Sequence, residues 1–207
     1  MTTERLRRLR PGTLDAAQRR LYDAIVAGPR AQTAAVLPVT DADGGLEGPF
    51  NPLLYSPELG MAVQRVGAQI RAGLSLTNRE RELVTLRCAV LCHSRYEIEA
   101  HSRLAVASGV TPAELEALIG SRLPEPLVDR DRLLLALGSA VVTGGGLDDH
   151  LYTQAVRALG ERAVVEIVLL AGYYVMLAAL LDAFRVAPPA SSDRIVGSEP
   201  AAPDPGD

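Results

Sequence analysis

The chain has 207 residues, 48% of them hydrophobic and 22% charged, which is enough apolar sequence for one folded domain and excludes wholesale disorder. The formal net charge is −4, so the basic surplus typical of nucleic-acid-binding proteins is missing and we expect no nucleic-acid partner. All 21 basic residues are arginine, which excludes a lysine Schiff base and the lysine of a phosphate-binding loop.

Apolar residues recur every three or four positions through most of the chain, and Gly or Pro interrupts them, which predicts an all-α fold. The expected helices cover residues 14–27, 56–71, 77–93, 94–108, 111–120, 127–142, 148–159 and 161–186. Residues 30–50 contain Pro38, Pro49 and a polar turn, which predicts an irregular segment that is either a lid over a site or an insertion.

Five of the expected helix starts have recognisable capping residues. Thr13 is the expected N-cap of the first helix, and Ser56 followed by Pro57 is a typical start of the second. Three further starts show a capping box, in which a hydroxyl residue is followed three positions later by Glu. These boxes are Thr77 to Glu80, Ser94 to Glu97, and Thr111 to Glu114.

The last expected helix is almost entirely apolar and approaches the length of a membrane span. Glu166 and Asp182 lie near its two ends and leave too short an apolar stretch between them, so we expect a buried central helix or an oligomer interface and no membrane partner. Residues 1–10 contain four arginines without a following apolar run, which differs from a secretory signal. We therefore expect a cytoplasmic protein.

The two cysteines, Cys88 and Cys92, are four residues apart in a predicted helix. Two thiols on one helix face cannot form a disulfide framework, and the simplest interpretation is that both are small buried side chains. His93, Glu97 and His101 would align as possible metal ligands if one continuous helix held all three. A helix start at Ser94 breaks that continuity, and no standard ligand motif is present, so we expect no metal.

His101 is the histidine with the most suggestive neighbours in the sequence. It follows Glu97 by one helical turn, Tyr96 lies on the same predicted helix, and Glu82 lies on the preceding one. An imidazole beside two carboxylates and a phenol can carry acid/base chemistry, because neighbouring charge and burial tune its pKa. The alternative is a core histidine whose hydrogen bonds are satisfied by one carboxylate.

The stretch R-E-R-E-L-V-T-L, followed by S-R-Y-E-I-E-A-H-S-R-L-A-V-A-S-G-V, resembles the carboxymuconolactone decarboxylase and alkylhydroperoxidase-D-like superfamily. Further pieces of the resemblance are G-P-R at residue 28, G-P-F at 48, S-P-E-L at 56, V-E-I-V-L-L-A-G-Y-Y at 165, and D-A-F-R-V near 182. The resemblance implies an AhpD-like fold of antiparallel helix pairs over residues 12–187, assembled into a homo-oligomer (trimer or hexamer). Residues 1–11 are then a flexible N-terminus, and residues 188–207 a disordered Pro/Ala-rich tail.

The peroxidase branch of that superfamily carries the pattern E-x11-C-x2-C-x3-H. This chain keeps the spacing as Glu82, Ser94, Glu97 and His101, but both thiols are replaced. A dithiol peroxidase needs one thiolate to attack the peroxide and a second thiol to resolve the product, and neither Ser nor Glu can do this. The resemblance therefore points to a branch without thiols, and a peroxidase that uses Cys88 and Cys92 remains an alternative.

For this branch the resemblance implies a lyase-type enzyme without a cofactor. The expected step is decarboxylation, isomerisation or a related reaction of a small lactone, keto acid or other carbonyl compound. The candidate catalytic residues are His101, Glu82, Tyr96 and Glu97. His101 would move the proton, Glu82 would orient the His101 imidazole, and Tyr96 would donate a hydrogen bond to an oxyanion. The candidate substrate-binding residues are Arg95, Ser94 and His93, with Arg79 and Arg103 as further choices for a carboxylate. The other interpretation is a non-catalytic binding or scaffold protein on the same fold.

Overall fold

The computed structural model describes residues 4–28 and 35–189. Within these residues the chain forms nine α-helices, one short 3-10 helix and no strand, so the prediction of an all-α fold is confirmed. The elements in chain order are η1 (Pro11–Thr13), α1 (Ala16–Val26), α2 (Phe50–Leu53), α3 (Pro57–Ala72), α4 (Asn78–Leu91), α5 (Arg95–Ala107), α6 (Pro112–Ile119), α7 (Asp129–Thr143), α8 (Asp149–Leu159) and α9 (Glu161–Phe184).

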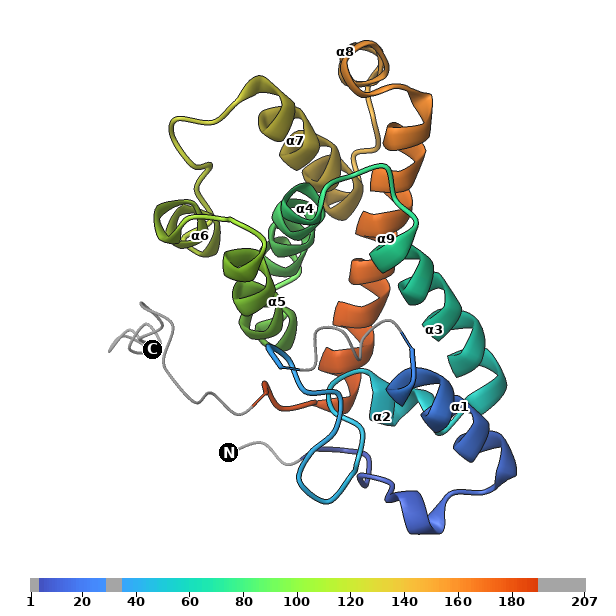
Figure 1. Ribbon diagram of the computed structural model, residues 1–207. Coiled ribbons are helices and arrows are strands. Elements are labelled where there is room, and N and C mark those ends of the chain that lie inside the picture. Colours follow the sequence, from blue (N-terminus) through green and yellow to red (C-terminus); the bar gives the residue numbers. More distant parts are fainter. Residues whose placement is uncertain (1–3, 29–34, 190–207) are drawn as a thin grey trace, which may run out of the picture.

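Helix α9 is the long axis around which the other helices pack (Figure 1). It contacts α4, α7 and α8, and its buried face includes Ile167, Leu170 and Leu177. By length and composition it could cross a membrane, with a mean hydropathy of 2.3, yet half of its most apolar window is buried inside the protein. Its packing therefore makes it a central core helix. Its remaining face exposes Val165 and Leu169.

Helix α4 lies between α5, α7 and α9, so most of its residues are buried on all sides of the helix. Its buried residues include Leu83 and Leu86, which pack in one cluster with residues of α5, α6 and α7, whereas Val84 and Cys88 pack with α7 and α9. Glu82 is also buried in this helix. A carboxylate buried at the centre of the fold requires compensating partners, and these partners define the site described below.

Two of the predicted capping boxes are confirmed. The Thr77 and Thr111 hydroxyls accept hydrogen bonds from the backbone N–H groups of Glu80 and Glu114, whose carboxylates bond back. The prediction for Ser94 is wrong, because its side chain caps no N–H of α5 and the Glu97 carboxylate turns to His101 instead.

The predicted start of the first helix is also wrong. Thr13 ends the 3-10 helix, and α1 begins after Asp15, whose carboxylate accepts hydrogen bonds from the backbone N–H groups of Ala17 and Gln18. The Gln18 side chain bonds back to the Asp15 N–H, so this capping box has Asp and Gln in place of Thr and Glu. Ser56 precedes α3 as expected, but its side chain makes no capping hydrogen bond.

The described part of the predicted irregular segment, residues 35–49, is folded onto the domain around Asp41. This carboxylate accepts hydrogen bonds from the N–H of Gly45 and from the side chains of Arg8 and Arg10. Leu46 is fully buried behind this turn. Through Arg8 and Arg10, these contacts also attach the first described residues to this segment. The segment leads directly into residues 48–50, which lie near the site described below.

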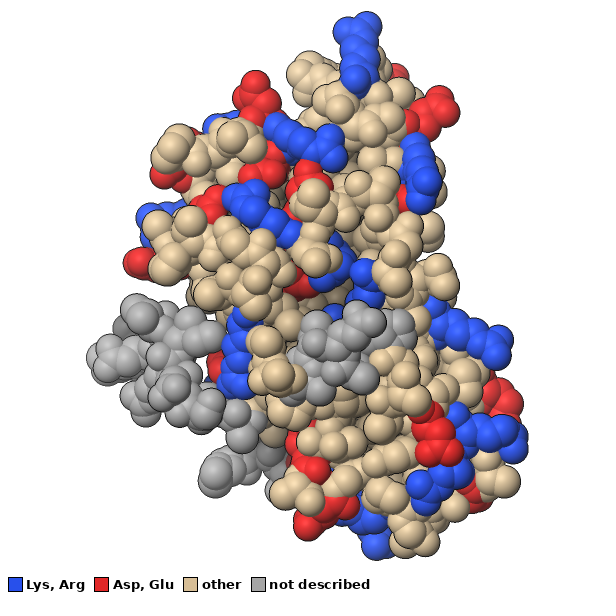
Figure 2. All heavy atoms as spheres, in the orientation of Figure 1, with Lys and Arg blue, Asp and Glu red and all other residues tan. Residues whose placement is uncertain are grey.

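The surface on the face shown in Figure 2 has acidic and basic side chains interspersed among uncharged ones. The tail expected to be disordered lies outside the described residues from position 190 onward.

Candidate active site

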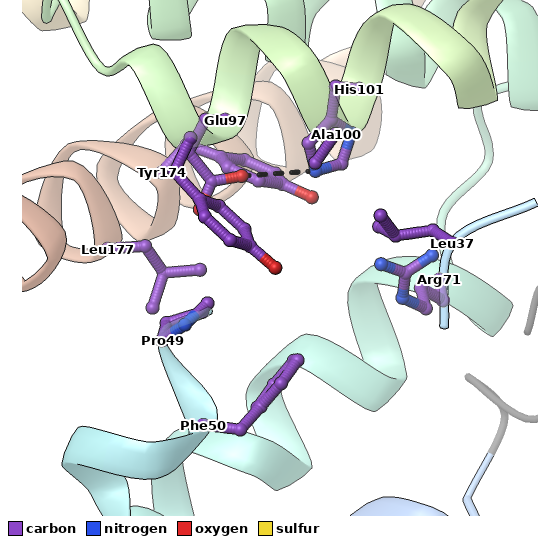
Figure 3. A pocket seen from close by; sticks show the side chains of 10 residues that line it. Leu37, Pro49, Phe50, Arg71, Glu97, Ala100, His101, Tyr174 and Leu177 are labelled. Carbon is purple, nitrogen blue, oxygen red and sulfur yellow. Dashed lines mark ion pairs between the residues drawn. The ribbon is translucent and has the colours of Figure 1, made fainter. Parts of the chain in front are cut away.

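A small cavity of about 20 Å³ lies where α3, α5 and α9 meet the segment before α2 (Figure 3). Its polar lining comes from Arg71, Tyr96, Glu97, His101 and Tyr174, and its apolar lining from Leu37, Pro49, Phe50, Ala100 and Leu177. This volume has room for one water molecule. A larger guest therefore enters only when lining side chains move.

His101 joins the cavity to the core of the fold. Its Nδ1 lies 2.6 Å from Glu82 Oε2, a contact that ties α5 to α4 across nineteen positions of sequence. The other oxygen of Glu82 accepts hydrogen bonds from the guanidinium of Arg81, at 3.2 Å and 3.0 Å. Glu82 and His101 are 1% and 3% exposed. The imidazole is thus fixed in orientation by a carboxylate that has a second cationic partner.

Glu97 is the third member of this hydrogen-bonded set, and it lines the cavity together with His101. Its Oε2 lies 3.2 Å from His101 Nε2, the contact drawn as a dashed line in Figure 3. Its Oε1 is buried and has no hydrogen-bond partner among the described residues. A buried carboxylate oxygen without a donor is unfavourable, so this atom is poised to accept a hydrogen bond or a proton from a guest.

The pKa values of the pair follow from its burial and charges. Burial by itself lowers the pKa of His101, but the carboxylates of Glu82 and Glu97 outweigh burial and hold that pKa above its ordinary value. Burial raises the pKa of Glu82, but His101 and Arg81 outweigh this effect and hold that pKa below its ordinary value. The geometry therefore favours the ion pair of imidazolium and carboxylate.

Two tyrosines line the cavity together with the imidazole. The Tyr174 ring meets His101 edge-on, with ring centroids 4.9 Å apart and an interplanar angle of 86°. Tyr96 lines the cavity from the first turn of α5 and is 6% exposed. Gly48, with φ +60°, lies directly against the Tyr96 phenol, where a side chain would overlap the ring.

Arg71 is the cationic side chain of the cavity lining. It projects from the end of α3 toward the space between the labelled side chains (Figure 3). Its Nε is buried and has no hydrogen-bond partner within the described part of the chain. By contrast, Arg79 is bound to Asp131 and Glu114, and Arg103 to Glu99, so both arginines considered from the sequence already have carboxylate partners.

The structure brings together Glu82, Glu97, His101 and Tyr96, and separates them from the three residues expected to bind substrate. His93 is exposed in a left-handed turn with φ 53°, and Arg95 is exposed at the first turn of α5. Ser94 is buried between them, and none of the three lines the cavity. The turn at His93 also removes it from the helical face of Glu97 and His101, so these three side chains do not align as metal ligands.

No group of three or more His, Cys, Asp or Glu side chains suited to a metal ion occurs in residues 4–28 and 35–189. The cysteines lie apart from the cavity lining. Burial raises the pKa of the Cys88 thiol to about 12, with a further rise from Cys92, and burial also raises the pKa of Cys92. Thiols with raised pKa values are poor nucleophiles at neutral pH, so this geometry does not favour peroxidase chemistry.

The fold and the buried Glu82–His101 pair can be compared with known proteins. Residues 57–125 match the model of the carboxymuconolactone decarboxylase family, and they contain Glu82, Glu97 and His101. No curated protein matches the sequence.

Solved structures show the same fold at low sequence identity. A peroxidase-related protein from Ralstonia eutropha JMP134 with an alkylhydroperoxidase AhpD core has a TM-score of 0.71 at 16% identity, over 91% of this chain and 94% of that chain. The debrominase Bmp8 has a TM-score of 0.68 at 16% identity, over 86% of this chain and 90% of its own. A protein of unknown function from Agrobacterium tumefaciens has a TM-score of 0.63 at 18% identity, over 70% and 100%.

The resemblance seen in the sequence is therefore confirmed over residues 57–125, which match the carboxymuconolactone decarboxylase family model, and the solved structures show that the fold of the chain is AhpD-like. Several lining residues were missed by the sequence reasoning although their motifs had been noticed. Pro49 and Phe50 come from the G-P-F motif, and Tyr174 from the G-Y-Y motif. Arg71 had no motif to mark it.

Proposed function

We propose that the cavity is the active site of an enzyme that performs acid/base chemistry without a cofactor on a small carbonyl compound. The step is decarboxylation, isomerisation or a related lyase reaction of a lactone, keto acid or similar molecule. The observation that carries this proposal is the buried series of contacts from Glu82 through His101 to Glu97, a residue that lines the cavity and has one buried carboxylate oxygen without a hydrogen-bond partner among the described residues.

In this proposal Glu97 Oε1 is the atom that exchanges a proton with the substrate carbon next to the carbonyl. The His101 imidazolium donates to the other Glu97 oxygen and stabilises the charge of that carboxylate, while Glu82 and Arg81 keep the imidazole in place. The Tyr96 phenol supplies a donor for the oxygen that gains negative charge. Glu97 stands at the position where the peroxidase pattern has its second cysteine, so a carboxylate replaces sulfur beside the same histidine.

A small substrate fits the dimensions of the site better than a macromolecule does. The cavity has room for about one water molecule, so a larger ligand needs lining side chains to move. A variant of the debrominase Bmp8, which has the same fold, was solved with 2,3,4-tribromopyrrole, a small ring. This supports a small-molecule substrate for the present chain.

The test measures exchange of a carbon-bound hydrogen for deuterium in D2O by NMR, using a panel of 2-oxo acids and carboxylated lactones. This readout detects proton abstraction whatever the later step is. We expect exchange with the wild type and a loss of about a hundredfold or more in Glu97→Gln and in His101→Asn, since general acid/base groups contribute factors of that order.

Glu99→Gln is the matched control, because Glu99 lies on the same helix, pairs with Arg103 and does not line the cavity. It should keep wild-type exchange. Unchanged exchange in His101→Asn would contradict the proposed role of His101. No exchange by the wild type across the panel would contradict the proposed activity and favour a binding or scaffold protein. Peroxide consumption that disappears in a Cys88→Ser/Cys92→Ser variant would favour the peroxidase alternative.

A further inference from the structure

Arg71 and Glu97 are a cation and an anion that face one cavity, and each has an unused hydrogen-bonding atom. The Arg71 Nε and the Glu97 Oε1 are both buried without a hydrogen-bond partner in residues 4–28 and 35–189. Glu97 is 3% exposed. Arg71 forms no ion pair with a described carboxylate, whereas its neighbour in space, Arg81, is bound to Glu82.

Arg71 Nε and Glu97 Oε1 need opposite kinds of hydrogen-bonding partner in a bound ligand. A guanidinium has donors alone, so its partner must accept and gains most if it is negatively charged. An ionised carboxylate has acceptors alone, so the partner of Glu97 Oε1 must carry an N–H or O–H group. A guest that satisfies both atoms therefore has an anionic oxygen beside a hydrogen-bond donor.

The charge of the site also favours an anion. With the His101 imidazole protonated, the positive groups outnumber the negative ones by one, because three cations face two carboxylates. These groups are Arg71, Arg81 and His101 on one side, and Glu82 and Glu97 on the other. An unmatched charge in a buried site is costly, and a guest with a single negative charge removes the mismatch.

We propose that Arg71 and Glu97 form a recognition pair for a small monocarboxylate with a hydroxyl or enol group on the neighbouring carbon. Arg71 donates to the carboxylate, and the hydroxyl or enol O–H donates to Glu97 Oε1. The proposal rests on the proposed function, because it names how a substrate of the same site is held. It replaces Arg79, Arg95 and Arg103 by Arg71 as the residue that determines specificity for an acid.

The experiment measures the binding of three small probes of similar shape by NMR titration in a buffer without carboxylate or phosphate. Lactate has both the carboxylate and the hydroxyl, propionate lacks the hydroxyl, and lactamide lacks the charge. We expect lactate to bind in the millimolar range and more tightly than the other two probes. In Arg71→Gln we expect lactate binding to weaken about tenfold or more, since a charge-assisted hydrogen bond is lost, and lactamide binding to stay unchanged.

Two further variants separate the roles of the pair. Glu97→Gln should remove the preference for lactate over propionate, because the amide no longer offers a charged acceptor. Arg65→Gln is the matched control, since Arg65 is exposed on the same helix, and it should bind all three probes like the wild type. Arg71→Lys keeps the charge and should retain part of the lactate affinity, which guards against a folding defect in Arg71→Gln.

The proposal is overturned if Arg71→Gln binds lactate like the wild type, if lactamide binds the wild type as tightly as lactate does, or if lactate does not bind in the millimolar range. A failure here is distinguishable from a failure of the proposed function. His101→Asn tests proton exchange, and the Arg71 titration needs no turnover.

Discussion

At the scale of single residues, the position of the Tyr96 phenol depends on Gly48. This glycine has φ +60° and lies so close to the Tyr96 ring that an added methyl group would occupy the same space. The two effects act together, since a non-glycine residue is strained at positive φ and the clash would push the phenol toward the cavity. Gly48 therefore belongs to the site although it has no side chain to react.

We expect Gly48→Ala to lower the free energy of unfolding by about 2–3 kcal/mol and to reduce activity through displacement of Tyr96. Gly144→Ala is the control, because Gly144 also has positive φ, at 77°, but no atom lies within 4 Å of an added methyl group. It should cost about 1 kcal/mol and leave activity unchanged. Equal losses of stability and activity in the two variants, measured by urea denaturation and proton exchange, would rule out the contact with Tyr96 as the cause.

Part of the site was predictable from residue spacing. Glu97 and His101 are one turn apart, so a helix over these residues places them on one face whatever the rest of the fold does. The contact of His101 with Glu82 required the resemblance, since it joins two helices. Arg71 was missed because the packing of α3 against the rest of the protein brings it to the cavity, and no local pattern encodes that packing.

At the scale of the elements, capping explains which helix starts were predicted correctly. Thr77 makes its box with Glu80, and the same carboxylate also binds Arg130. At Ser94 the same pattern of residue types gives no box, because Glu97 is used by His101. A motif of four residues determines which capping hydrogen bonds are possible, and tertiary contacts determine which of those hydrogen bonds form.

Thr77→Ala should therefore destabilise the protein by about 1 kcal/mol, since a capping hydroxyl is lost. Ser94→Ala should cost no more than about 0.5 kcal/mol, because Ser94 makes no capping bond to lose. The two variants remove the same group from neighbouring helices, and their urea midpoints can be compared directly. A larger loss for Ser94→Ala would show that its hydroxyl caps α5 in solution.

At the scale of the whole molecule, the buried pair of Glu82 and His101 couples folding to pH. The folded state raises the pKa of His101 above its ordinary value of 6.5, so this stabilisation is complete below pH 6.5 and is lost as pH rises through the folded value. The folded state lowers the pKa of Glu82 below its ordinary value of 4.5, so that stabilisation is complete above pH 4.5 and is lost as pH falls through the folded value. Both contributions are complete between these two values.

The melting temperature should therefore be highest at weakly acidic pH and should fall as the solution becomes alkaline. In His101→Asn the alkaline decline should become smaller, because the titrating group is gone. His93→Gln is the control, since His93 is exposed, and it should keep the wild-type profile. Calorimetric scans across the pH range provide the measurement, and a decline of equal size in all three proteins would show that other groups cause it.

The two cysteines differ in exposure, so the expectation that both are buried is wrong for Cys92, and this difference has a practical consequence for experiments on this protein. Cys88 is buried, whereas Cys92, at the end of α4 and just before the helix that holds His101, is partly exposed. A maleimide fluorophore or spin label offered to the native chain therefore has one attachment point, with no engineering of the sequence, and unfolding uncovers the second. The label would report from the turn beside the site, and the stoichiometry of alkylation would count the unfolded molecules.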